Sequence, residues 1–123
     1  MRIRTVLGGV GRLAMAGVYL KGGWDGFNEP GARPQIAATI GLPESELLVR
    51  ANGAAMMAGG AALATGILPR AAATGLIASM VPITLAGHAF WKEEDPKLRA
   101  RQQGQFLKNL GLIGGLLVYL SRD

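Results

Sequence analysis

Two long uncharged stretches, separated by a single arginine, constrain this chain more than any other feature. Residues 51–69 contain no ionisable side chain, and residues 71–91 contain only His88. A helix needs about 20 predominantly apolar residues to cross a hydrocarbon core of roughly 30 Å. Both stretches have about that length, and the connection of one or two residues around Pro69-Arg70 requires antiparallel neighbouring helices. We therefore predict a transmembrane hairpin.

A further apolar segment follows the N-terminal arginines, from Thr5 to about Phe27. We interpret it as a retained helix and not as a secretory signal, because Arg12 splits it and no convincing small-residue cleavage site follows. Arg12 then lies roughly 10 Å inside the helix, at 1.5 Å per residue. Two explanations stay open: its side chain reaches the lipid headgroups, or it faces the other helices and binds an anion or a helix-end carbonyl.

The fourth apolar segment begins after a densely charged turn and runs to the C-terminal end. Half of the residues are hydrophobic and only 17% are charged, and the uncharged runs lack the polar positions that a soluble helix or strand would show at regular periods. We predict an all-α integral membrane four-helix bundle, a single domain over residues 1–123, built from two antiparallel transmembrane hairpins. The expected helices are about 5–27, 45–68, 71–91 and 105–121, and residues 34–42 are expected to form an interfacial segment or short helix.

Small residues recur at four-residue spacing, as in Gly22 with Gly26 and in Gly111 with Gly115. In lipid, helices associate through close backbone approach and interhelical hydrogen bonds, because burying apolar surface gives no net drive there. We predict that these glycines serve helix packing.

Four crossings would place the polar ends of all four helices on one side of the bilayer. The residues gathered there form a candidate ligand or proton site: Trp24, Asp25, Asn52, His88, Trp91, Lys108 and Asn109. His88 could donate to a quinone carbonyl, with Asp25 as its charge partner and the tryptophans flanking a flat ring. In the alternative interpretation, the tryptophans are interface anchors and the polar residues only hold the hairpins together.

Composition argues against catalysis by this chain alone. The absence of cysteine removes thiol chemistry, a single histidine cannot supply both axial ligands of a haem, and no nucleophile-base pair or phosphate loop is evident. A bound metal or haem is therefore not expected, whereas a quinone could fit the polar site. The net charge of +5 comes from basic residues flanking the spans, which indicates a lipid surface and not nucleic acid as the partner.

Several motifs together resemble the DoxX family of small four-helix membrane proteins. They are Arg12 with Gly22-Gly23-Trp24-Asp25, Gly41-Leu42-Pro43, Thr65-Gly66-Ile67-Leu68-Pro69-Arg70, His88-x-Phe90-Trp91, and Phe106-Leu107-Lys108-Asn109-Leu110 with Gly114-Gly115-Leu116-Leu117. The resemblance implies a membrane subunit or organiser for redox and sulfur chemistry, since relatives are linked to thiosulfate:quinone oxidoreduction and to assemblies with superoxide dismutase and a sulfurtransferase.

Three functions follow as hypotheses. The first is a DoxX-like subunit of a redox, sulfur-metabolism or respiratory complex in the bacterial inner membrane, without catalytic residues of its own and with membrane or peripheral redox proteins as partners. The second is a quinone- or lipid-binding module with a polar pocket at one end. The third is a membrane scaffold or assembly factor, in which the small-residue faces form the interface, including that of a homo-oligomer.

Overall fold

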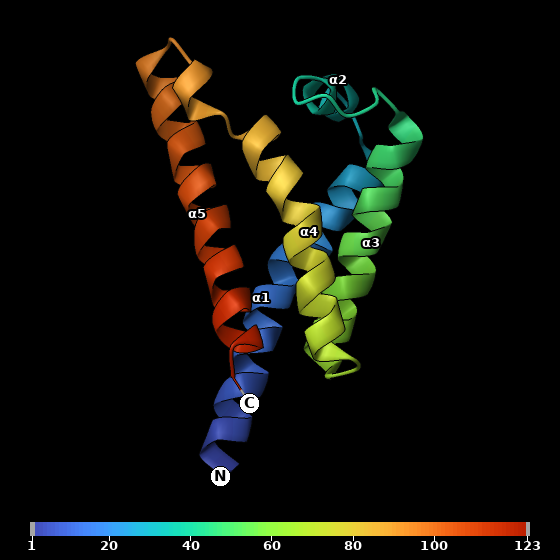
Figure 1. The fold of residues 1–123 in the computed structure, drawn as a ribbon, viewed down its shortest axis with the longest axis vertical. Helices are drawn as coiled ribbons and strands as arrows, with labels where there is room; N and C mark the ends of the chain where they lie inside the picture. Colours follow the sequence, from blue (N-terminus) through green and yellow to red (C-terminus); the bar gives the residue numbers. More distant parts are fainter. Residues whose placement is uncertain (1, 123) are drawn as a thin grey trace.

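The structure, a computed structural model, describes residues 2–122, and that part of the chain is helical without strands. Four long helices and two short ones make up the fold (Figure 1). In chain order they are α1 (Arg2–Asn28), α2 (Arg33–Ala38), α3 (Glu46–Thr65), α4 (Pro69–Gly87), the 3₁₀ turn η1 (Phe90–Lys92) and α5 (Pro96–Leu120). The all-α prediction is therefore confirmed.

The long helices alternate in direction, with α1 and α4 rising and α3 and α5 descending in Figure 1. They pack in the order α1, α3, α4 and α5, and α1 and α3 contact each other more extensively than any other two helices. Both chain ends lie at the bottom of the view, and the short helix α2 covers the top. This arrangement brings four segments to the same region of the molecule: the last turns of α1, the first turns of α3, the last turns of α4 and the middle of α5.

The prediction that the last helix begins near residue 105 was wrong, because α5 begins at Pro96. The Asp95 carboxylate accepts a hydrogen bond of 2.9 Å from the Lys97 backbone N–H, and proline at the first helical position has no N–H to leave unpaired. The charged residues after Pro96 form exposed helical turns. Hydropathy locates where apolar sequence starts, whereas the capping residues locate where the helix starts.

The connection between α3 and α4 also differs from the prediction, because three residues, Gly66, Ile67 and Leu68, separate the helices. The predicted ends at 68 and 71 are therefore displaced to Thr65 and Pro69. Gly66 has a φ of +77° and its backbone N–H donates to the Ala62 carbonyl, which is the usual way for a glycine to end a helix.

The third predicted helix was expected to reach Trp91, but α4 ends at Gly87. Phe90, Trp91 and Lys92 form the separate turn η1. His88 is thus the residue that leaves the helix, and its side chain is presented at a helix end instead of along a helix face.

Glycines allow α1 and α3 to approach each other at backbone distance. A Cβ atom on Gly23 would lie 2.5 Å from the Gly53 carbonyl oxygen, and one on Gly53 would lie 2.6 Å from the Gly23 carbonyl oxygen. Gly26 is buried beside Gly53, and a Cβ atom on Gly60 would meet Tyr19 Cβ at 3.2 Å. Among the glycines of residues 2–122, Gly23 and Gly53 therefore make the closest approach, and the four-residue spacing did not single them out.

The glycines predicted for packing have mixed surroundings. Around Gly22 the nearest atom to an added Cβ is the methyl carbon of Met56, at 3.3 Å, and around Gly115 it is that of Met15, at 3.5 Å. Gly111 is exposed and would have nothing within 4 Å of an added Cβ. For Gly111 the prediction fails within this chain, because α5 turns that face away from the other described helices.

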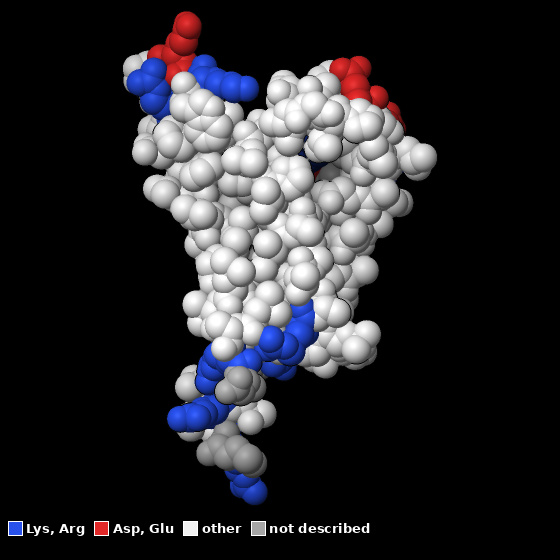
Figure 2. Space-filling view, in the orientation of Figure 1, with Lys and Arg blue, Asp and Glu red and all other residues white. Residues whose placement is uncertain are grey.

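Large apolar side chains cover much of the outer surface. On α1 alone, Ile3, Val6, Leu7, Val10 and Leu13 are 58–69% exposed. Across the middle of the face seen in Figure 2 there is no charged side chain, and charges gather at the two ends. A soluble monomer rarely exposes apolar surface of this extent.

Among residues 2–122, two stretches are long and apolar enough to cross a membrane, Glu46–Thr65 and Pro69–Lys92. In each, only 22% of the most apolar window is buried inside the molecule. The apolar faces of α3 and α4 are thus mostly available to lipid or to a partner.

Candidate functional site

A cavity of about 820 Å³ lies at the end of the molecule covered by α2. All five α-helices contribute to its lining. Five of the seven predicted site residues line it: Asp25, Asn52, His88, Lys108 and Asn109. Its volume is within the range of small-molecule sites.

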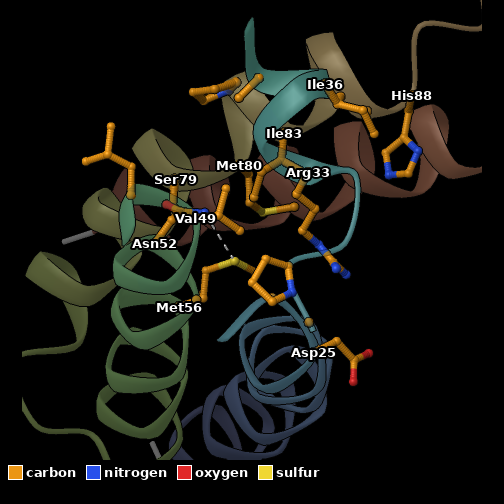
Figure 3. Close-up of a pocket in the computed structure, with 18 of the residues that line it drawn as sticks. Asp25, Arg33, Ile36, Val49, Asn52, Met56, Ser79, Met80, Ile83 and His88 are labelled. Carbon is orange, nitrogen blue, oxygen red and sulfur yellow. Dashed lines mark hydrogen bonds between the residues drawn. The ribbon is translucent and has the colours of Figure 1, made fainter. Parts of the chain in front are cut away.

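The cavity has a polar and an apolar side. In Figure 3, the charged residues Asp25 and Arg33 lie on one side with His88, which has Ile36 beside it. Val49, Met56, Met80 and Ile83 line the space towards α3 and α4, where Asn52 and Ser79 are the polar residues. This arrangement suits a molecule with one polar and one apolar part.

The predicted pairing between Asp25 and His88 does not occur. Lys21 Nζ donates to both carboxylate oxygens of Asp25, at 2.7 and 2.6 Å. His88 Nδ1 lies 2.8 Å from Gln102 Oε1. An amide oxygen only accepts, so Nδ1 donates, and Nε2 remains available to another group. The two residues share the cavity without contacting each other, because each has a nearer partner.

Two polar pairs connect the helices around the cavity. The Ser79 hydroxyl of α4 donates to Asn52 Oδ1 of α3 at 2.6 Å, and Asn109 Nδ2 of α5 donates to the Thr84 hydroxyl of α4 at 3.1 Å. Thr84 and Asn109 are buried. The two asparagines therefore connect neighbouring helices while lining the cavity.

The two tryptophans lie away from the cavity, so the expectation that they flank a bound ring is not met. Trp24 is 59% and Trp91 52% exposed. Trp91 packs edge-on against Phe90 and Phe106, with ring centroids 5.3 and 5.7 Å away. The turn η1 and the third turn of α5 position this aromatic cluster at the surface.

Among the lining residues that the sequence analysis did not assign to the site are Arg33 and Tyr19. Arg33 opens α2, and its Nη1 donates to the Glu29 carbonyl. Arg33 lies in the proline-containing connection between α1 and α3, and nothing in that connection's sequence predicted that its side chain would lie near the other charged residues. The only available signal is the Pro30 and Pro34 pair, whose buried rings hold α2 against the bundle.

Tyr19 is fully buried, and its hydroxyl has no hydrogen-bond partner among the residues described. The residue lines the cavity from α1. Because a buried polar group normally has a partner, this hydroxyl is a place where a water molecule or a ligand atom would be stabilised.

Arg12 lies at the opposite end and takes no part in the cavity. Its Nε donates to the Leu63 carbonyl at 3.1 Å, and Leu63 lies in the last turn of α3. The last carbonyls of a helix lack partners within the helix and attract cations. The contact corresponds to the helix-end carbonyl considered for Arg12 from the sequence.

In the described part of the chain, no three histidine or acidic side chains lie together as metal ligands would. The residues around the cavity can donate and accept hydrogen bonds and compensate charge. None of them forms a nucleophile-base pair with another in the hydrogen bonds of the structure.

The comparisons with known proteins give one result. No curated protein and no solved structure matches the chain. The sequence model of the DoxX family matches residues 9–89, that is 81 of the 123 residues. The chain therefore belongs to the DoxX family, which indicates a membrane protein in contact with the lipid bilayer.

Proposed function

We propose that residues 1–123 form a single multi-pass domain in which α1, α3, α4 and α5 cross the cell membrane as two antiparallel hairpins. The family membership supports a membrane location. At 1.5 Å per residue, the 27 residues of α1 and the 25 of α5 extend over roughly 40 and 37 Å, enough to span the hydrocarbon core. Arg12, the one arginine well inside α1, has its Nε bonded to the Leu63 carbonyl.

Within that membrane domain, the function supported best by the geometry is the binding of an amphipathic small molecule, a quinone or a lipid. The observation that carries this proposal is the 820 Å³ cavity, in which polar residues from all five α-helices and an apolar wall meet. Catalysis is not part of the proposal, because the residues lining the cavity offer hydrogen bonds and charge but no activated nucleophile.

A second candidate, the accessory subunit of a redox or sulfur-metabolism complex, is favoured by the cluster of Phe90, Trp91 and Phe106. Aromatic residues that are rigidly held and half exposed are typical anchors of protein interfaces. The cluster lies beside the charged connection before α5 and could receive a peripheral protein. In this role the bound molecule would be positioned for a partner enzyme, which would carry out the chemistry.

The test compares two tryptophan substitutions on α4. Ile83→Trp fills the cavity that Ile83 lines, and Leu85→Trp is the matched control, because Leu85 is 46% exposed and is not part of the lining. Each protein is purified from native membranes in mild detergent, and both the extracted small molecules and the associated proteins are identified by mass spectrometry.

We expect a stoichiometric small molecule with wild type and Leu85→Trp and at least about a tenfold loss with Ile83→Trp. No such molecule in wild type, or equal amounts in the two variants, would contradict the binding function. A redox protein that co-purifies with the wild type and both variants would support the accessory role, and the absence of any associated protein would count against it.

A further inference from the structure

The charged side chains around the cavity indicate which chemical class of ligand it can bind. Arg33 and Lys108 are its cationic lining residues, and Asp25 is the one carboxylate among those described. Both oxygens of Asp25 are already bonded to Lys21. The nearby acid Glu46 likewise accepts from Arg50, at 2.8 and 3.0 Å. The carboxylates of Asp25 and Glu46 are therefore engaged with cations outside the lining.

The cations of the cavity have no comparable partners. Arg33 donates to a neutral backbone carbonyl, that of Glu29. Within residues 2–122, the Lys108 ammonium takes part in no hydrogen bond or ion pair. Both side chains are exposed, and a hydrogen bond between a cation and an anionic group is stronger than one between neutral groups. The positive charges of Arg33 and Lys108 therefore favour the binding of a negatively charged group in the cavity.

The depth of the cavity fits a lipid chain behind that group. Met56 is ten residues beyond the start of α3 at Glu46, and Ser79 is eight before the end of α4 at Gly87, so the lining extends roughly 15 Å along α3 and roughly 12 Å along α4 at 1.5 Å per residue. The polar headgroup layer is about 5–8 Å thick on each side of the hydrocarbon core. With the helices spanning the membrane, the cations lie at headgroup level and the apolar wall lies in the hydrocarbon region.

We propose that the cavity binds an amphiphile with an anionic carboxylate or phosphate headgroup, placed between Arg33 and Lys108, and an acyl chain packed on Val49, Met56, Met80 and Ile83. This inference rests on the binding function proposed above and specifies its ligand. A neutral flat ring fits less well, because it leaves both cations uncompensated and because the two tryptophans lie outside the cavity.

The experiment measures binding to the full chain in a neutral maltoside detergent at a pH where fatty acids in detergent are ionised. The probes are oleate, oleyl alcohol with the same chain length and a neutral head, and inorganic phosphate without a chain. Isothermal titration calorimetry is performed on wild type, R33Q/K108Q, and the matched control K97Q/R101Q, which removes two exposed charges of α5 outside the cavity.

We expect oleate to bind wild type and K97Q/R101Q at least about tenfold more tightly than oleyl alcohol. R33Q/K108Q should lose about tenfold or more in oleate affinity, since a hydrogen bond to a charged group is stronger than a neutral one, and it should keep its affinity for the alcohol. R33K, which retains the charge, should recover part of the loss and shows that the effect is not one of unfolding.

Equal affinity for oleate and oleyl alcohol would contradict the proposal that the ligand has an anionic headgroup. The same holds if R33Q/K108Q binds oleate as tightly as the K97Q/R101Q control does. The binding function would survive that result if Ile83→Trp still removed the alcohol. Phosphate binding as tightly as oleate would also overturn the proposal, because the occupant would then be a free anion. If no probe bound and native extracts contained no ligand, both the proposed binding function and the proposed anionic ligand would be refuted.

Discussion

Two helix pairs in this molecule are joined by different means. Between α1 and α3, glycines bring the backbones together, and Gly23 and Gly53 leave no room for a side chain. Between α4 and α5, polar pairs form the connection, Thr84 with Asn109 inside and His88 with Gln102 further out. The first pair provides a rigid wall, and the second surrounds part of a cavity. Close backbone packing and an open polar site thus occur side by side in one small domain.

The largest loss of thermal stability is expected from a substitution at the contact between Gly23 and Gly53. In Gly53→Ala the new methyl group would meet the Gly23 carbonyl oxygen at 2.6 Å and the Phe27 amide nitrogen at 2.8 Å. Backbone atoms cannot rotate away, so the helices must separate, at a cost of about 3 kcal/mol or more. Thermal unfolding in detergent should show a clear decrease in Tm.

Gly111→Ala is the matched control for that substitution. Its methyl group would meet nothing within 4 Å, and alanine is favoured over glycine in a helix. An unchanged or slightly raised Tm is expected. If both variants lost the same stability, the close α1–α3 approach would not be the important contact.

An intermediate effect is expected at the inner polar pair. Asn109→Ala removes the 3.1 Å hydrogen bond and leaves the buried Thr84 hydroxyl without it. Interhelical hydrogen bonds in membrane proteins contribute about 1 kcal/mol, so the decrease in Tm should be smaller than for Gly53→Ala. The double variant Thr84→Val/Asn109→Leu, which removes both polar groups, should recover part of the loss; no recovery would indicate that packing and not the hydrogen bond was lost.

The smallest effect is expected at the outer pair. Gln102→Ala removes the acceptor from half-buried His88, and water can replace it there, so the change in stability should be about 0.5 kcal/mol or less. The same thermal scan, with Gln103→Ala as an exposed neighbour for comparison, measures it. A loss as large as that of Asn109→Ala would mean that the α4–α5 connection depends on its outer contact.

Much of the site was predictable because helix ends could be ordered along the sequence. Asp25, Asn52, His88, Lys108 and Asn109 do line one cavity. The Lys21–Asp25 pair follows from an i,i+4 spacing on one helix and was readable from the sequence, whereas the pairing of His88 with Gln102 depends on the α4–α5 contact and was not. Arg33 entered the site only because α2 folds over the bundle, and that depends on contacts made by a connection with no periodic pattern.

The sequence by itself determined that the chain is helical, that two uncharged stretches form long neighbouring helices, and that charges gather at the ends, because these properties depend on length, hydropathy and spacing along one helix. Only the tertiary structure decided which glycines meet. Gly23 and Gly53 lie at the α1–α3 contact while Gly111 faces away, and a four-residue repeat marks a face of a helix without saying what that face meets. The same holds for Arg12, whose partner, the Leu63 carbonyl, is 51 residues away and is free only because α3 ends there.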